Sequence, residues 1–297
     1  MMLGVAFSAT IGGMGSLIGT PPNALFAAYM EEAHGLVIGF AEWMLVGLPV
    51  VIILLPLTWL SLTRLTFRIS DSPLTFEFEQ MPSVSAGEMR VAAIAALTTF
   101  GWITRPLIAD AFPGLEITDA GIAMFGALLL FLVPGGNGMK RLLDWKTAAT
   151  LRWDVLILFG GGLSLATVID SSGLAAWIGE TAQGMAGLPM ILVLVAMALI
   201  VVYLGELASN TAMAAVFIPI AGAVAIGTGH DPLTFALPVA LAASIGFMLP
   251  VATPPNAIVF ANPAVDRGNM LRAGAPLDLL GIAIALLAGM VLGPLVL

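Results

Sequence analysis

Long apolar segments separated by short polar connections run through nearly the whole chain. We expect membrane-spanning segments near residues 1–30, 42–63, 91–108, 119–134, 154–170, 189–228, 234–262 and 275–297. A helix of about 20 mostly apolar residues is long enough to cross roughly 30 Å of hydrocarbon, and several of these segments reach or approach that length. The pattern therefore predicts an all-α polytopic membrane protein.

Basic residues gather in three of the polar connections and give the expected orientation. They are Arg64, Arg68 and Arg90 in the first connection, Lys140, Arg141, Lys146 and Arg152 in the second, and Arg267 and Arg272 in the third. Because short cytoplasmic loops collect Lys and Arg, all three connections are expected on the cytoplasmic side. Residues 67–90 of the first connection are polar and include prolines, as is typical of a linker. The second is predicted to include a short amphipathic surface helix within residues 135–154.

The stretch 189–228 must leave and return on the outer side if the last basic connection is cytoplasmic. The segments 154–170 and 234–262 already complete one path out and one path back, so we predict a re-entrant hairpin with arms near 189–207 and 212–228. Its tip carries the polar run Glu206-Leu207-Ala208-Ser209-Asn210-Thr211. A non-helical tip at membrane depth is tolerated only where it lines protein or a watery cavity. The tip is therefore a candidate binding site.

Two further polar interruptions each contain a pair of prolines. They read Ile18-Gly19-Thr20-Pro21-Pro22-Asn23 and Val251-Ala252-Thr253-Pro254-Pro255-Asn256. Proline lacks a backbone donor and breaks a helix, which frees upstream carbonyl groups near the middle of the membrane. Such carbonyls are sodium ligands, and the positive N-terminal ends of the half-helices that follow favour an anion.

The two proline interruptions form an internal repeat. Both contain Thr-Pro-Pro-Asn-Ala, at residues 20–24 and 253–257. The loop argument makes the first copy run outward and the second inward, which is the inverted repeat typical of alternating-access transporters. Residues 1–66 are then the end of the first repeat and residues 67–90 a cytoplasmic linker. Residues 91–297 are the second repeat, with the hairpin 189–228, the broken helix 234–262 and the last span 275–297.

Composition narrows the class of function. Of the 297 residues, 60% are hydrophobic and 9% are charged, a balance that places the chain in a bilayer. The net charge of -8 argues against a nucleic-acid partner, because such proteins set clustered Lys and Arg against phosphates. With no Cys, the chain has no thiolate nucleophile or thiolate metal site. We expect a multi-pass protein of a bacterial inner (plasma) membrane.

Three segments resemble signatures of one transporter family. IGGMGSLIGTPPNALFAAY, SNTAMAAVFIPIAGAVAIG and FMLPVATPPNAIVFA look like segments of the divalent anion:sodium symporter family, the sodium-coupled carriers of dicarboxylates, citrate and related anions. The likeness spans essentially the whole chain. It implies an inverted-repeat secondary transporter, not an enzyme, with a re-entrant hairpin and two broken helices. Such a carrier moves a small succinate-like anion with Na⁺ by alternating access, and the complete protein is expected to be a homodimer.

The resemblance also implies which residues bind. The substrate carboxylate would contact Ser209, Asn210, Thr211, Thr253, Pro254, Thr20 and Pro21. One sodium ion would be bound by the Asn210 side chain and by the backbone carbonyls of Gly205, Ala208 and Ala252, and a first-repeat sodium site would use the carbonyl of Gly19. Na⁺ is the implied cofactor ion.

The chain departs from the family pattern at its beginning. A complete member carries a first Ser-Asn-Thr hairpin before the first Thr-Pro break, preceded by scaffold helices, and this chain starts after that point. One sodium site and half of the substrate clamp are then expected to be incomplete. The alternatives are a non-functional or partner-dependent fragment of such a transporter, and a carrier of sulfate or another anion.

Simpler explanations compete for each motif. Ser, Asn and Thr are preferred helix N-cap residues, and a Thr-Pro break is also compatible with an ordinary proline kink. Glu206 is costly at membrane depth, so it is either a direct ligand or a group that attracts cations from a watery vestibule. Ordinary solvated or capping roles are expected for three acidic residues near span ends, Asp144, Asp154 and Asp278.

Two other classes of function fit less well. An intramembrane enzyme needs a nucleophile with a base, paired acids or a His-Glu-x-x-His motif, and the sequence has no convincing set. A channel also uses broken helices with polar tips, but channels usually repeat them around a symmetry axis and do not invert them.

Overall fold

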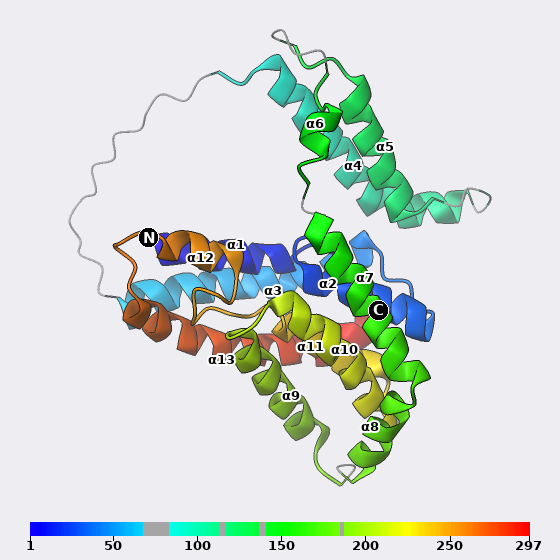
Figure 1. Cartoon of the computed structure of the whole chain (residues 1–297), viewed down its shortest axis with the longest axis vertical. Coiled ribbons are helices and arrows are strands. Elements are labelled where there is room, and N and C mark those ends of the chain that lie inside the picture. The colour runs from blue at the N-terminus through cyan, green and yellow to red at the C-terminus, as the bar shows by residue number, and fades with distance from the viewer. Residues whose placement is uncertain (68–82, 113, 115–116, 137–140, 152, 185–186) are drawn as a thin grey trace. The chain divides into compact units, whose positions relative to one another are not determined.

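Every regular element in the computed structural model is a helix, within the described residues 1–67, 83–112, 114, 117–136, 141–151, 153–184 and 187–297. The chain divides into two units (Figure 1). The larger comprises Met1–Ile38, Glu42–Ile69 and Asp154–Leu297, and the smaller comprises Gly39–Ala41 and Ser70–Trp153. All-helical structure is expected for a chain in hydrocarbon, because a helix satisfies its own backbone groups.

The larger unit is built from helices that are mostly apolar on all sides. They are α1 (Met2–Met14), α2 (Pro21–His34), α3 (Phe40–Leu60, whose first two residues belong to the smaller unit), the π-helical turn η1 (Ser61–Thr66), α7 (Trp153–Ser171), α8 (Leu174–Gln183), α9 (Met190–Gly205), α10 (Asn210–Gly227), α11 (Pro232–Ala242), α12 (Pro254–Phe260), α13 (Arg267–Val291) and α14 (Gly293–Val296). Helix α11 lies at the centre, in contact with α2, α9, α10 and α13.

Aromatic residues near the two non-helical interruptions, between α1 and α2 and between α11 and α12, form part of the buried core. The side chains of Phe7, Phe26, Trp43 and Phe247 are fully buried. Phe7 in α1 packs on Phe247, in the loop between α11 and α12, with ring centroids 5.2 Å apart, and Phe26 packs on Trp43 at 5.8 Å. Because each buried aromatic ring contributes a large apolar area, these pairs fix the segments around the breaks to one another.

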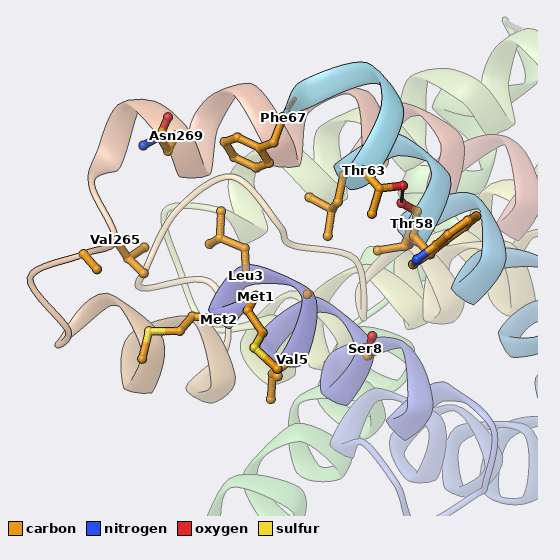
Figure 2. Close-up of a pocket in the computed structure, with 14 residues that line it drawn as sticks. Met1, Met2, Leu3, Val5, Ser8, Thr58, Thr63, Phe67, Val265 and Asn269 are labelled. Carbon is orange, nitrogen blue, oxygen red and sulfur yellow. Dashed lines mark hydrogen bonds between the residues drawn. The ribbon is translucent and has the colours of Figure 1, made fainter. Parts of the chain in front are cut away.

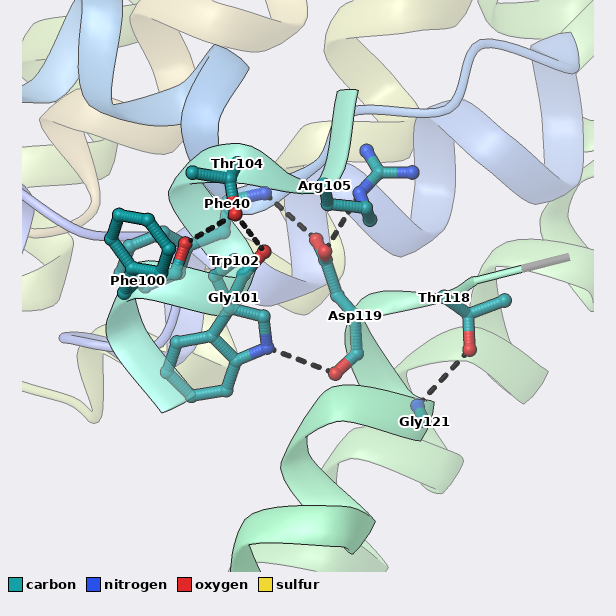
Figure 3. A network of polar contacts seen from close by, with 9 residues as sticks. All are labelled: Phe40, Phe100, Gly101, Trp102, Thr104, Arg105, Thr118, Asp119 and Gly121. Atoms are coloured by element: carbon teal, nitrogen blue, oxygen red, sulfur yellow. Dashed lines mark hydrogen bonds and ion pairs between the residues drawn. The ribbon is translucent and has the colours of Figure 1, made fainter. Parts of the chain in front are cut away.

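The smaller unit contains α4 (Ala86–Ala111), α5 (Asp119–Leu132) and the short α6 (Trp145–Ala148), with α4 packed along α5. Asp119 joins them (Figure 3): its carboxylate accepts from the Phe40 amide at 2.8 Å and pairs with Arg105 Nε at 2.8 Å. The Trp102 indole N–H donates to the Asp119 carbonyl at 2.9 Å, and the Trp102 ring stacks on Phe40. Asp119 therefore links the start of α5 to α4 and to Phe40 in this sparsely buried unit.

Removing the Asp119 carboxylate is expected to destabilise this unit. Asp119→Ala leaves the Phe40 amide and the partly buried Arg105 guanidinium without this acceptor, and hydrogen bonds to charged groups contribute about 1.5 to 3 kcal/mol. We expect the free energy of unfolding in detergent to fall by about 1 to 2 kcal/mol, since the pair is partly exposed. The exposed Glu180→Ala is the control. Equal stabilities of the two variants would contradict this account.

Among the described residues, four helical segments are long and apolar enough to cross a membrane by length and composition. They are Phe40–Thr66, Ala86–Ala111, Asn210–Gly227 and Arg267–Val296, and α7 with α8 adds a fifth if this pair, bent by 65°, is one span. The other apolar helices, α1, α5, α9 and α11, are shorter. The prediction of a polytopic, all-helical membrane protein is therefore confirmed.

Several predicted boundaries differ from the helices observed. α13 begins at Arg267 instead of near residue 275, because the Asp266 side chain caps it by accepting from the Asn269 amide. α4 begins at Ala86, where Ser85 and Glu88 form a capping box, so the predicted linker 67–90 ends earlier than expected; its residues 68–82 lie outside the described residues. Of the surface helix predicted within 135–154, the described part forms only α6, capped by Asp144, and residues 137–140 and 152 are not described.

Candidate functional site

The polar run at 206–211 separates α9 from α10. α9 ends at Gly205 and α10 begins at Asn210, with Ser209 as its N-cap residue. The Ser209 side chain is exposed and makes no capping hydrogen bond, so it leaves the first-turn N–H groups of α10 available. Thr211 is buried in the first turn of the same helix. The helix N-terminus here has the partial positive charge that favours an anion.

Asn210 has a buried oxygen that lacks a donor. Its Oδ1 atom is shielded from solvent and has no hydrogen-bond partner among the described residues. The amide lies between two glycines from different elements, because a methyl group built on Gly205 would be 3.3 Å from Oδ1 and one built on Gly246 would be 3.6 Å away. A buried amide oxygen without a donor is costly unless a donor or a cation is supplied. This environment fits a sodium ligand.

The two proline interruptions have the same local structure. Thr20 is the N-cap residue of α2 with φ −137° and ψ 147°, and Thr253 is the N-cap residue of α12 with φ −136° and ψ 150°. Prolines occupy the first positions of both helices, where a missing N–H costs little. The chain is non-helical between Met14 and Pro21 and over most of the segment between Ala242 and Pro254. Both copies of the repeat are thus helix breaks rather than kinks within continuous helices.

An asparagine holds each break in the same way. The Asn23 amide nitrogen donates to the carbonyls of Gly13 at 3.3 Å and Ser16 at 2.9 Å, ten and seven residues earlier. Asn256 donates to Gly246 at 2.9 Å and Leu249 at 3.1 Å, with the same separations. Both asparagines are fully buried. The Asn of each Thr-Pro-Pro-Asn motif therefore donates to two carbonyls of the preceding break, of which those of Ser16 and Leu249 also accept from the Gly19 and Ala252 amides.

The two breaks are also joined to each other. α1 packs on α12, as Figure 1 shows, and α2 packs on α11, so each helix before a break lies against the helix after the other break. Two hydroxyl contacts accompany this packing: Thr10 donates to Thr253 at 3.3 Å, and Thr20 lies 3.1 Å from the Ser244 hydroxyl. Thr253 therefore lies against α1 and Thr20 against the loop that follows α11, and Gly246 of the same loop lies beside the Asn210 amide.

Two buried carboxyl groups hold the loop between α11 and α12. Glu206, 2% exposed, accepts from the Met248 and Leu249 amides, and Asp278 of α13, fully buried, accepts from the Phe247 amide. The expectation that Asp278 is a solvated or capping residue near a span end was wrong, because its position lies within α13 on the face packed toward the core. Its partner lies 31 residues away, a separation that no local pattern reveals.

One large cavity lies away from these residues. It has a volume of about 1030 Å³ and is lined by residues of α1, the end of α3, η1 and the start of α13, with Leu3, Trp59 and Val265 among them. Figure 2 shows mostly apolar side chains around it, and no acidic or basic side chain lines it. A second cavity of about 370 Å³ is lined in part by Glu32, His34 and Asp170. Neither cavity is lined by the predicted binding residues.

Comparison with known proteins gives consistent matches over the full chain. The sequence model of the sodium:sulfate symporter transmembrane region matches residues 1–297. A sodium-dependent dicarboxylate transporter, SdcS, of Staphylococcus saprophyticus is 37% identical over 307 residues, and SdcS of Staphylococcus aureus is also 37% identical over 307 residues. The matched region covers 100% of this chain and 59% of each relative. The chain therefore spans about three fifths of the length of these relatives.

Proposed function

Because the chain belongs to the sodium:sulfate symporter family, whose transmembrane region its residues 1–297 match, we propose that it forms part of a sodium-coupled carrier of small di- or tricarboxylates. The family is the one that the sequence resemblance indicated. It is a family of transporters rather than enzymes, and this member is a multi-pass integral membrane protein. The succinate-like substrate is inferred from relatives named as dicarboxylate transporters.

The observation that carries the proposal is the pair of repeat-related breaks beside the tip of α9 and α10. In our proposal α1 with α2, and α11 with α12, are the two broken helices of inverted repeats, and α9 with α10 is a hairpin that enters and leaves on the outer side. Residues 1–66 end the first repeat, residues 67–90 are cytoplasmic, and residues 91–297 form the second repeat. The reciprocal packing of α1 on α12 and α2 on α11 supports this arrangement.

Sodium enters this proposal as a co-transported substrate. Its ligands are Asn210 Oδ1 with the carbonyls of Gly205, Ala208 and Ala252, and the carbonyl of Gly19 contributes to the first-repeat site. The Asn210 site is supported by the Oδ1 atom, which has no donor among the described residues, and by its position between the tip and Gly246. Carbonyl and amide oxygens suit a hard cation. The ion would then join the tip of α9 and α10 to the loop that follows α11.

The anion would lie where three helix N-termini begin. Ser209, Asn210 and Thr211 open α10, Thr253 and Pro254 open α12, and Thr20 and Pro21 open α2. The first-turn N–H groups of α10 and its helix dipole favour a carboxylate. α2 and α12 begin with two prolines, which have no N–H, so these helices contribute their dipoles and not first-turn donors. The Thr253 hydroxyl already accepts from Thr10 and the Asn256 amide, and Pro254 and Pro255 have no N–H, so we assign the role of this segment to the helix dipole of α12. Alternating access would move this group of elements relative to the scaffold, and the complete carrier is proposed to be a homodimer.

Uptake of labelled succinate into proteoliposomes tests the proposal. An inward sodium gradient is expected to drive saturable uptake, and a choline gradient is not. Because the matched region covers 59% of SdcS, a second preparation should also contain the part of SdcS that this chain does not match. Succinate uptake that is absent from both preparations would overturn the proposal.

The description of the matched family supports sulfate as a second candidate substrate. Excess unlabelled sulfate in the same uptake assay separates the two anions. A dicarboxylate carrier should retain succinate uptake in sulfate, whereas a sulfate carrier should accumulate labelled sulfate with sodium and show no succinate uptake.

A further inference from the structure

The Glu206 carboxylate binds backbone amides near the proposed sodium site and not the ion itself. It follows the last residue of α9, between Gly205 and Ala208, and is only 2% exposed. Its Oε1 atom accepts from the Met248 amide at 2.8 Å and its Oε2 atom from the Leu249 amide at 2.6 Å. Both carboxylate oxygens are therefore committed to backbone donors of another element. This geometry favours a structural link over the direct sodium-ligand role considered from the sequence.

Asp278 continues the same set of contacts. Its Oδ1 atom accepts from the Phe247 amide at 3.0 Å, and the next two amides along the chain donate to Glu206. Three consecutive amides, at residues 247–249, are thus held by two acids from α13 and from the tip beside α9. Buried N–H groups in a non-helical segment must find acceptors, and these two carboxyl groups supply them.

Residues on both sides of the 247–249 loop lie near the proposed sodium site or belong to it. Gly246, which precedes the three amides, lies beside the Asn210 amide, and Ala252, a proposed carbonyl ligand, follows three residues after Leu249. Glu206 itself lies between the proposed ligands Gly205 and Ala208. One side chain therefore ties together the two chain segments whose carbonyls must converge on one ion.

We propose that Glu206 is a positioning residue that clamps the 247–249 loop to the tip of α9 and α10, so that sodium ligands from both segments meet. Asp278 supports the same loop through Phe247. The inference rests on the proposed function for its consequence, sodium affinity, but the clamp itself is a structural statement. A carboxylate suits this role because both of its oxygens accept, whereas one end of a Gln amide would turn donors toward an N–H group.

Two variants distinguish the loss of the Glu206 hydrogen bonds to the loop from a general loss of packing. Glu206→Gln loses one of the two amide acceptors, whereas Asp278→Asn keeps an oxygen for the Phe247 amide. Hydrogen exchange of the full chain in detergent with choline should show faster exchange of the Met248 and Leu249 amides in Glu206→Gln than in Asp278→Asn or the wild type. Unchanged exchange of both amides in Glu206→Gln would overturn the clamp, whatever the chain transports.

Sodium binding gives the second readout. Ligands that bind the folded state raise its melting temperature, so the sodium concentration at half-maximal stabilisation reports affinity. We expect Glu206→Gln to need about tenfold more sodium or more, and Asp278→Asn to remain close to the wild type. A purely structural loss would lower the melting temperature equally in sodium and choline and leave the sodium midpoint unchanged, which would overturn the positioning role.

The wild-type chain itself could show no rise in melting temperature with sodium, and this result would bear on the proposed function. It would count against the proposed function and against the consequence assigned to the clamp, while the exchange experiment would still decide whether the clamp exists. If Glu206→Gln does not fold, Glu206→Asp replaces it. The shorter carboxylate is expected to reach fewer of the loop amides and to give the same two changes, and wild-type exchange and sodium midpoint in that variant would overturn the proposal.

Discussion

Asn210→Ala is expected to weaken the sodium response of this protein strongly. The substitution deletes the buried Oδ1 atom that lacks a donor at the tip of α9 and α10, and leaves the proposed site with backbone carbonyls alone. A hydrogen bond to a charged group is worth about 1.5 to 3 kcal/mol, and we take a similar value for this contact to the ion, so sodium affinity should fall by about 10- to 100-fold. The measurement is the sodium dependence of the melting temperature, with sodium-driven succinate uptake in proteoliposomes beside it.

Asn269→Ala is the matched control for this variant. Asn269 lies in the first turn of α13, and its side chain bonds the capping residue Asp266, outside the proposed ion site. Its removal should change stability slightly and leave the sodium midpoint at the wild-type value. A wild-type sodium midpoint in Asn210→Ala would show that the orphaned oxygen has another role and would reject the sodium site as proposed.

The helix breaks were predictable because their causes are local. Paired prolines at residues 21–22 and 254–255 exclude a continuous helix, and α2 and α12 begin at these prolines. The polar run 206–211 likewise interrupts two apolar stretches, and the gap between α9 and α10 falls within it. Identical five-residue motifs also predicted related structures, and the backbone angles of Thr20 and Thr253 differ by only a few degrees.

Contacts between distant segments were not predictable from local patterns. Asp278 looked like a span-end carboxylate because no feature of its own helix indicates that the Phe247 amide lies opposite. The 65° turn into α8 was missed because residues 170–173 resemble an ordinary loop, although Gly173, with a φ of 80°, allows the chain to turn and resume a helix. The bonds from Asn23 and Asn256 use a residue inside the recognised motif, but their carbonyl partners emerge only in three dimensions.

Two glycines, Gly47 and Gly274, permit the close helix packing at the breaks. A methyl group on Gly47 of α3 would lie 2.5 Å from the Met14 carbonyl oxygen, and one on Gly274 of α13 would overlap the Phe247 carbonyl. Met14 ends α1 before the first break, and Phe247 lies in the loop of the second. At both breaks, therefore, the long helix that follows, α3 or α13, approaches the break so closely that only glycine fits.

Gly274→Ala is expected to cause the largest loss of stability. The atoms that the new methyl group meets are backbone atoms, including the Met248 nitrogen at 2.6 Å, and the loop cannot move away freely because Asp278 and Glu206 hold its amides. Overpacking of a tight site costs typically 1 to 3 kcal/mol, and we expect about 3 kcal/mol in the free energy of unfolding in detergent. The sodium midpoint should rise as well, since the displaced loop carries Gly246 and Ala252.

Gly161→Ala in α7 provides the control for this substitution. It is also a helical glycine, but no atom lies within 4 Å of the built methyl group, so the change should leave stability unchanged or raise it by about 1 kcal/mol through helix propensity. If Gly274→Ala were as stable as Gly161→Ala, α13 would not press on the 247–248 backbone. The loop would then be held by its hydrogen bonds to the two carboxyl groups alone, and Glu206→Gln would become the more damaging substitution.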